Sequence, residues 1–163
     1  MASILKVDQI NDRTNNNTAI EVDGSGRVTQ PQRPFIQAIH NSHLTYSAND
    51  LIGSGGEITV KENRGITHSN GVFTLPIAGL YSLEISLIST TTGSGIYWQK
   101  NSTDQWRIAY MADADSYWSQ SGCRILTECS VNDTISFKAE ASMALYGNAG
   151  TANVGSINIL FLG

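Results

Sequence analysis

Apolar and polar side chains alternate with a period of two along several segments of the chain. The clearest is residues 80–87 (LYSLEISL), in which every odd-numbered residue from Tyr81 to Leu87 is apolar and every residue between them is polar. A period of two predicts a β-strand with one face in a core. Similar alternation occurs in residues 134–141 and 156–161, and no window of useful length has the period of a helix.

Turn-forming residues separate these segments. The strongest signal is Asn70-Gly71, because a two-residue type I′ hairpin turn needs positive φ at both positions, and Asn and Gly adopt it most easily. Further strands are expected at residues 35–39, 58–61, 96–100, 106–111 and 118–126. About eight short strands at this spacing predict an all-β fold, a two-sheet jelly-roll sandwich.

The first 33 residues have a different pattern. Residues 4–10 (ILKVDQI) predict one short strand, and residues 19–30 (AIEVDGSGRVTQ) predict a small hairpin that turns at residues 23–26. Because isolated hairpins are marginally stable in water, this N-terminal β-hairpin arm is expected to need a partner surface. The candidate docking residues of the arm are its apolar side chains: Leu5, Val7, Ile10, Ile20 and Val22.

The length of 163 residues is enough for one domain with a hydrophobic core and a short appendage. Pro31 and Pro34 mark the boundary, which predicts an N-terminal arm at residues 1–33 and a head at residues 34–163. Only 15% of the residues are charged while glycine is abundant, a composition that favours strands and tight turns over long surface helices.

Charge and hydropathy argue against several classes of protein. The formal net charge is −4 and no run of Lys or Arg occurs, so nucleic-acid binding is not expected. No apolar segment approaches the roughly 18 residues that a transmembrane helix needs. The first residues, MASILKVDQINDRT, have no apolar signal core. The protein is therefore expected to fold in a cytoplasm, without membrane insertion.

The sequence offers little for catalysis or metal binding. No Gly-x-Ser-x-Gly elbow follows a predicted strand, and no carboxylate pair or histidine has a context that predicts a shifted pKa. We therefore expect no enzymatic activity and no cofactor. Asp113 and Asp115 are weak candidates for calcium ligands, but Ca²⁺ takes about six to eight oxygens, so a solvated acidic loop is the preferred interpretation. Cys123 and Cys129 lie on one face of a predicted strand, too far apart to bridge, and are expected to be free thiols.

Aromatic residues crowd one span of the chain: Trp98, Trp106, Tyr110, Tyr117 and Trp118. Parity places Trp106, Ile108 and Tyr110 on one face, which predicts a core face or a subunit contact. Tyr97 and Trp98 must point to opposite faces, so one of them is a candidate for exposure. Aromatic rings stack on sugars, and the candidate glycan contacts are Trp98, Tyr117 and Trp118.

Three segments resemble the complement globular-head branch of the tumour-necrosis-factor-like jelly rolls: residues 71–89 (GVFTLPIAGLYSLEISLIS), 126–140 (LTECSVNDTISFKAE) and 155–163 (GSINILFLG). The resemblance covers residues 33–163 and implies a ten-strand jelly roll that forms a tight three-fold homotrimer. It also implies that Phe73, Tyr81 and Phe161 belong to the aromatic set in the core and near the subunit contacts. The sequence has no Gly-X-Y stalk, signal peptide or paired extracellular cysteines, which disfavours an animal secreted ligand.

The N-terminal residues 3–28 (SILKVDQINDRTNNNTAIEVDGSGRV) resemble the opening of many small phage virion proteins, including tail-fibre and tail-associated subunits. Together the two resemblances imply a non-enzymatic virion surface protein, a homotrimeric short tail fibre or knob whose head contacts a host-surface glycan. The arm would attach this trimer to another virion subunit. A capsid decoration or cement trimer is the first alternative, and a free lectin-like or ligand-like module is the second.

Overall fold

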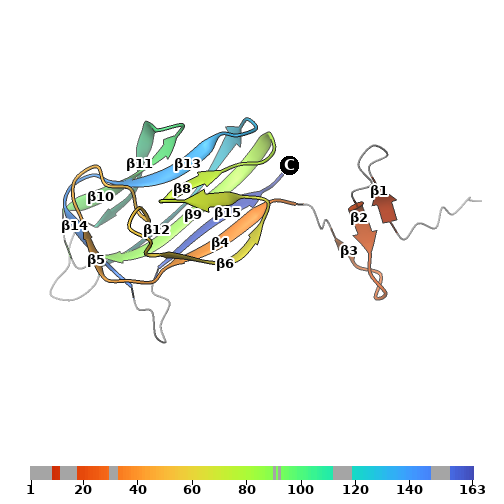
Figure 1. Ribbon diagram of the computed structural model, residues 1–163, viewed down its shortest axis with the longest axis horizontal. Helices are drawn as coiled ribbons and strands as arrows, with labels where there is room; N and C mark the ends of the chain where they lie inside the picture. The colour runs from red at the N-terminus through yellow and green to blue at the C-terminus, as the bar shows by residue number, and fades with distance from the viewer. Residues whose placement is uncertain are drawn as a thin grey trace, which may run out of the picture. The chain divides into compact units, whose positions relative to one another are not determined.

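The computed structural model describes residues 9–11, 18–29, 33–89, 91, 93–111, 119–147 and 155–163. Every regular element within these ranges is a β-strand (Figure 1). The chain divides into two compact units, Met1–Arg33 and Pro34–Gly163. None of the described residues forms a helix that is long and apolar enough to cross a membrane.

The N-terminal unit contains a small antiparallel sheet in the order β1-β2-β3, formed by β1 (Gln9–Asn11), β2 (Thr18–Val22) and β3 (Val28–Thr29). The turn between β2 and β3 lies where the sequence predicts it, and the Gly26 amide donates to the Asp23 carbonyl over 2.8 Å. The Asp23 carboxylate accepts from the Ser25 and Arg27 amides at 2.9 and 3.0 Å. The predicted hairpin is therefore present, and β1 extends it to three strands.

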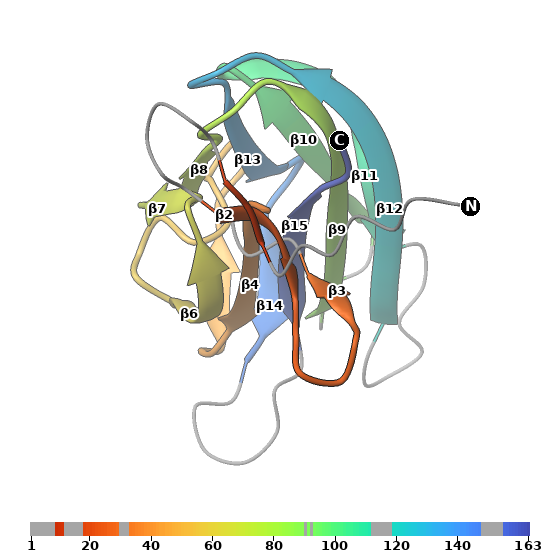
Figure 2. The same cartoon turned by 90° about the vertical axis from the view of Figure 1, so that its right-hand side faces the viewer.

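The head consists of two antiparallel sheets that enclose one core (Figure 1, Figure 2). The five-stranded sheet contains, in spatial order, β11 (Thr103–Met111), β10 (Ser94–Lys100), β13 (Thr134–Ala139), β8 (Val72–Thr74) and β7 (Thr67–Ser69). The seven-stranded sheet contains β5 (Leu44–Tyr46), β14 (Met143–Tyr146), β9 (Gly79–Ser89), β15 (Ser156–Phe161), β4 (Phe35–His40) and β6 (Ile58–Arg64), with β12 (Ser119–Cys129) paired to β9. The predicted all-β jelly-roll sandwich is confirmed.

The core lies between the sheets and takes alternate residues from their strands. In β9 the predicted inward residues from Tyr81 to Leu87 are all buried. From the facing sheet, the rings of Phe73 and Phe137 meet edge to face with 6.4 Å between centroids. Phe161 packs against the margin of the core, edge to face with Tyr81 at 5.2 Å. The structure thus places Phe73 and Tyr81 inside the core and Phe161 beside it.

The two-residue turn between β7 and β8 is the predicted Asn70-Gly71 turn. Its φ angles are +48° at Asn70 and +77° at Gly71, which gives both residues the positive φ of a type I′ turn. A Cβ at Gly71 would lie 2.5 Å from the Ile52 carbonyl oxygen. A side chain at this position would therefore force the turn away from the loop that contains Ile52.

Both cysteines lie on β12 as free thiols, as predicted. Cys129 is buried and Cys123 is partly buried. Burial raises the pKa of the Cys129 thiol. The Cys129 side chain therefore stays protonated at neutral pH and packs as a small apolar residue of the core.

Candidate functional site

The outward face of the seven-stranded sheet carries a polar row across four strands. The registers place Gln37 opposite Asn158, Asn158 opposite Glu84, and Glu84 opposite Arg124. Residues directly opposite each other in antiparallel strands have their side chains on the same face. Glu84 is exposed while its two neighbours in β9 are buried, so the whole row faces outward.

Glu84 and Arg124 carry opposite charges and stand directly opposite in register, yet they form no ion pair with each other. The Arg124 Nε–H instead donates to the Ser82 Oγ over 2.7 Å. Neither Glu84 nor Arg124 takes part in an ion pair within the described part of the chain. One anion and one cation therefore lie side by side on this face without a salt-bridge partner.

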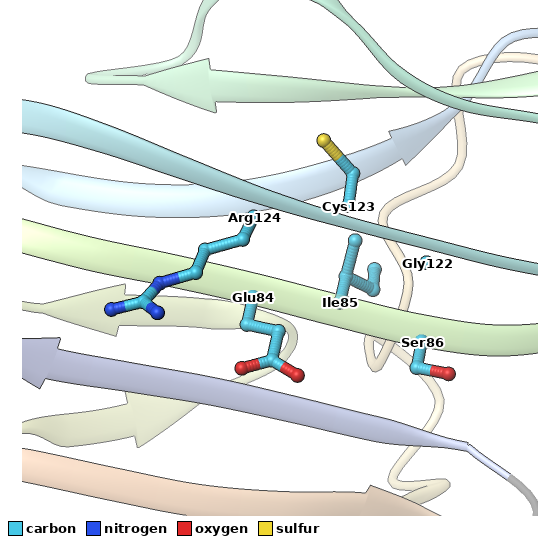
Figure 3. A pocket seen from close by; sticks show the side chains of 6 residues that line it. All are labelled: Glu84, Ile85, Ser86, Gly122, Cys123 and Arg124. Atoms are coloured by element: carbon cyan, nitrogen blue, oxygen red, sulfur yellow. The ribbon is translucent and has the colours of Figure 1, made fainter.

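A shallow hollow of about 410 Å³ lies beside this pair. Its lining residues are Glu84, Ile85, Ser86, Gly122, Cys123 and Arg124 (Figure 3). The hollow opens where Gly122 stands opposite Ser86, because both residues are small. A Cβ at Gly122 would lie 3.5 Å from the Ile85 carbonyl oxygen, which is an ordinary contact. An alanine at this position therefore meets no clash, and a larger side chain would extend into the hollow.

Exposed apolar side chains border the polar row. The registers place Phe35 opposite Leu160, Leu160 opposite Ser82, and Ser82 opposite Leu126. Leu126 is 56% exposed and Leu160 is 39% exposed. Leu126 and Leu160 thus lie on either side of Ser82 and form an exposed apolar strip next to the unpaired charges. We refer to this surface, defined by Ser82, Glu84, Gly122, Arg124, Leu126 and Leu160, as the seven-stranded face.

The outward face of the five-stranded sheet is built from aromatic rings and paired charges. Tyr97 stands opposite Arg107 on one side and Lys138 on the other, and Gly95 stands opposite Tyr110. The Arg107 guanidinium carbon lies 4.7 Å from the Tyr110 ring centroid and 5.9 Å from the Tyr97 ring centroid. We refer to the following residues as the aromatic platform: Tyr97, Asp104, Arg107, Tyr110, Lys138 and Glu140.

Both cations of the aromatic platform have partners within the chain. Arg107 forms an ion pair with Glu140, and Lys138 forms one with Asp104. The hydrogen bond from Lys138 lowers the pKa of the Asp104 carboxyl group, and the hydrogen bond to Glu140 raises the pKa of Arg107. The Tyr97 hydroxyl also donates to Glu140 Oε1 over 3.4 Å. These contacts connect side chains of β10, β11 and the end of β13 across the outward face of the sheet.

A register shift between β10 and β11 determines which aromatic residues of β11 are exposed. The register with β10 shifts at Ile108, which is an extra residue on β11 and reverses the alternation after it. Ile108 is buried, whereas Tyr110 is 46% exposed and shares its face with Arg107, and Trp106 is 51% exposed. The prediction that Trp106, Ile108 and Tyr110 share one face is therefore wrong for Tyr110, and only Ile108 is buried.

Trp98 is excluded as a glycan contact because it lies in the core. Its side chain is 1% exposed, and its ring packs edge to face against Trp106 with 5.2 Å between centroids. Tyr97 takes the outward position on β10, as the alternation of a strand requires. The aromatic candidate on this strand is therefore Tyr97, which is partly exposed and belongs to the platform.

Several candidates from the sequence lie outside the described residues: Leu5, Val7, Asp113, Asp115, Tyr117 and Trp118. Of the other docking candidates, Ile20 lies in β2, and Ile10 and Val22 are exposed. Val28 in β3 is exposed as well and was not among the candidates. Within the described ranges, no group of three or more His, Cys, Asp or Glu side chains is placed to hold a metal ion.

A buried polar cluster links β4, β5 and the loop before β6. His40 Nε2 lies 2.8 Å from the Tyr46 hydroxyl, which donates to Glu57 Oε1, and the Gly53 amide donates to the same oxygen over 2.9 Å. Burial lowers the pKa of His40 and raises the pKa of Tyr46. Because all three side chains are buried, the cluster fixes the loop and is closed to a substrate. No local spacing in the sequence predicts it, since it forms only when the loop folds over β5.

No family model and no curated protein sequence matches the chain. Known structures, however, match about four-fifths of it. The Eiger TNF from S. frugiperda superposes with a TM-score of 0.64 and 10% sequence identity, over 80% of this chain and 94% of that one. The fold is that of the tumour-necrosis-factor-like jelly rolls.

Two further structures share this jelly-roll fold. The globular domain of the zebrafish complement 1qA protein has a TM-score of 0.57 and 12% identity, over 79% of this chain and 96% of that one. The PRD1 vertex protein P5 has a TM-score of 0.57 and 16% identity, over 80% of this chain and 97% of that one. The resemblance to the complement globular heads and the tumour-necrosis-factor-like proteins is thus confirmed for the fold.

Proposed function

We propose that this protein is a non-enzymatic component of the outer surface of a bacteriophage particle, in which three copies associate through their seven-stranded faces. The observation that carries the proposal is that Glu84 and Arg124 have no ion-pair partner among the described residues and lie beside exposed leucines and a hollow. Another copy of the chain offers a cation to Glu84, an anion to Arg124 and exposed leucines to the leucines. The resemblance to tumour-necrosis-factor-like jelly rolls adds the expectation of three-fold symmetry.

A ring of three copies uses both charges of every copy. In a head-to-tail ring, Glu84 of each chain meets Arg124 of the next, and the ring closes when the third chain meets the first. Because Glu84 and Arg124 are direct neighbours in each chain, one rotation forms all three pairs close to the symmetry axis. Burial of Leu126 and Leu160 in the same contact offsets the cost of removing the charges from water.

The N-terminal unit supplies attachment to another subunit of the particle. Its three-stranded sheet exposes Ile10, Val22 and Val28, and a sheet of this size cannot enclose a core of its own. The outer strands β1 and β3 each have an edge that can pair with a strand of another protein. Docking through these edges and apolar side chains anchors the trimer while its heads stay outside.

Two positions on the particle have separate support. The N-terminal resemblance to tail-associated subunits favours a short tail fibre or knob, which is made in the host cytoplasm with the rest of the particle. The likeness of the head to the PRD1 vertex protein P5 favours a position on the capsid, as a decoration or cement trimer. We place the tail knob first because its support comes from the segment that attaches the protein.

The oligomeric state in solution tests the proposed contact. The purified protein should scatter light as a particle of about 53 kDa, three times the 17.6 kDa of one chain. A Gly122→Trp substitution fills the hollow and should produce a folded monomer with an unchanged circular dichroism spectrum. The matched control, Gly122→Ala, adds only a Cβ with ordinary contacts and should remain trimeric. A monomeric natural protein, or a trimeric Gly122→Trp variant, would contradict the proposal.

The position on the particle is tested with assembled phage. Particles made with a protein that lacks residues 1–33 should not contain it, whereas particles made with the full chain should. Gold-labelled antibodies should decorate the tail tip if the protein is a knob, and the capsid if it is a decoration trimer. A truncated protein that keeps its full activity free in solution would support a lectin-like module instead.

A further inference from the structure

The charges of the aromatic platform cancel within one chain. Arg107 is neutralised by Glu140, and Lys138 by Asp104. A surface whose cations and anions are already paired presents little net field to a charged ligand. The chemistry that fits this part of the five-stranded sheet is therefore that of an uncharged ligand.

The rings of the platform are held in fixed positions and still reach solvent. The Arg107 guanidinium carbon lies 4.7 Å from the Tyr110 ring centroid, and the Lys138 Nζ lies 5.8 Å from the Tyr97 ring centroid. Such cation–π contacts restrict the tyrosines, so a ligand that stacks on them causes little further loss of side-chain entropy. Tyr110 remains 46% exposed and offers an apolar surface to the C–H face of a sugar ring.

Hydrogen-bonding groups lie next to this aromatic surface. Glu140 Oε2 is not among them, because it is buried against Gly95. A Cβ at Gly95 would lie 2.5 Å from Glu140 Oε2 and 2.8 Å from Arg107 Cδ, so the glycine lets both side chains lie flat over the strand. The guanidinium of Arg107 has five N–H donors, more than its ion pair with Glu140 uses, and it offers the others to a ligand.

We infer that the aromatic platform binds a neutral pyranose residue. The C–H face of the sugar stacks on Tyr110, and a hydroxyl group accepts from an N–H of the Arg107 guanidinium that the ion pair with Glu140 leaves over. Each head holds a complete platform, so the binding of a single sugar does not require a trimer. That the sugar belongs to a glycan on a host surface rests on the proposed function.

The inference is tested by saturation-transfer NMR on the full chain. The probes are methyl glycosides of glucose, galactose, mannose and N-acetylglucosamine, with sialyllactose and a methyl glucuronide as charged comparisons. At least one neutral probe should receive saturation, and the charged probes should receive less. Absence of transfer to all neutral probes, or stronger transfer to the charged ones, would overturn the inference.

Substitutions locate the binding on the platform. Tyr110→Ala removes the stacking surface and should weaken binding about tenfold. Gly95→Ala should also weaken it, because the new Cβ displaces Glu140 and Arg107. The matched control is Val131→Ala, an exposed apolar residue in the turn between β12 and β13, which should leave binding unchanged. Equal binding by the Tyr110→Ala and Val131→Ala proteins would overturn the placement of the sugar.

The Gly122→Trp variant tests sugar binding independently of the proposed trimer. Its heads should bind the same methyl glycoside with unchanged affinity, while retention on a sugar-coated surface falls because avidity is lost. Sugar binding by a natural protein that is monomeric would leave the platform intact and contradict only the proposed trimer. A trimer that binds none of the neutral probes would contradict only the platform.

Discussion

The two outward faces of the sandwich treat cross-strand charge in opposite ways. On the aromatic platform, Arg107 reaches past the strand of Tyr97 to pair with Glu140, although its direct neighbour in register is a tyrosine. On the seven-stranded face, Glu84 and Arg124 are direct neighbours in register and do not pair. Strand register therefore places charged side chains near each other, and the neighbouring side chains determine whether an ion pair forms.

The aromatic platform has its charges paired within one chain, whereas the seven-stranded face, among the described residues, does not. The ion pairs of the platform are satisfied inside one chain, so a second protein gains little electrostatic energy by covering it. The seven-stranded face keeps one anion and one cation that another chain can pair. Association through the seven-stranded face and recognition of a neutral ligand through the platform are therefore compatible in one assembly.

Both sheets pack on the same core, so a substitution that shortens a core side chain should destabilise both faces together. Tyr81→Ala removes a fully buried ring that packs on Phe161 and whose hydroxyl donates to the Ile77 carbonyl over 2.9 Å. The free energy of unfolding should fall by about 3–5 kcal/mol, as measured by urea denaturation. A fall below about 1 kcal/mol would mean that β9 does not hold the two sheets together.

Charge reversal should affect the seven-stranded face alone. Glu84→Arg places two cations side by side in each chain and should weaken the trimer at least about a hundredfold, since breaking a buried charge pair costs roughly 2–5 kcal/mol. Sedimentation equilibrium measures the change. The double variant Glu84→Arg with Arg124→Glu restores one charge of each sign and should recover the trimer. If the double variant stays monomeric, the two side chains do not meet across the contact.

Acid should destabilise the head through one histidine in each sheet, the buried His40 in β4 and the partly buried His68 in β7. Burial lowers the pKa of both below the usual 6.5, so the unfolded chain binds more protons once the pH falls below that value. Their contribution to stability is complete above pH 6.5 and is lost as the pH falls through the lowered pKa.

Urea denaturation at pH 7.5 and pH 5 measures this loss. The His40→Gln protein should lose less stability on acidification than the natural protein, because one buried imidazole no longer takes up a proton. A His68→Gln protein gives the corresponding value for the five-stranded sheet. Equal losses in the natural protein and both variants would show that the two histidines do not control the pH dependence.

The smallest effect on stability is expected on the aromatic platform. Arg107→Gln removes a solvent-exposed ion pair, and pairs of this kind contribute little to folding because water screens them. The urea midpoint should therefore stay the same within error. A clear drop in the midpoint would mean that the platform is a structural brace, and the contrast between the two faces would disappear.

Local signals in the sequence account for much of the fold. The alternation from Tyr81 to Leu87 identifies β9 and its buried side, and the Asn70-Gly71 turn is defined by the φ angles that only a few residue types adopt easily. Both depend on neighbouring residues alone, so the sequence is sufficient to predict them. The two-sheet architecture follows from many such strands.

The candidate sites depend on relations between distant residues. Glu84 and Arg124 meet through the register of β9 with β12, and no local pattern determines that register. The extra residue at Ile108 is seen only in the pairing of β11 with β10, and no glycine or proline marks it in the sequence. Parity therefore assigned Tyr110 to the wrong face. A prediction of the platform would have required knowledge of how β11 pairs with β10.

The position of β15 in its sheet determines when the head can fold during synthesis. This strand is translated after both β4 and β9, yet it lies between them in the sheet and pairs with both. Until it leaves the ribosome, β4 and β9 have no strand to join them, and their hydrogen-bonding edges stay open. A nascent head is thus exposed to mispairing with its neighbours on the same messenger RNA until β15 has been translated.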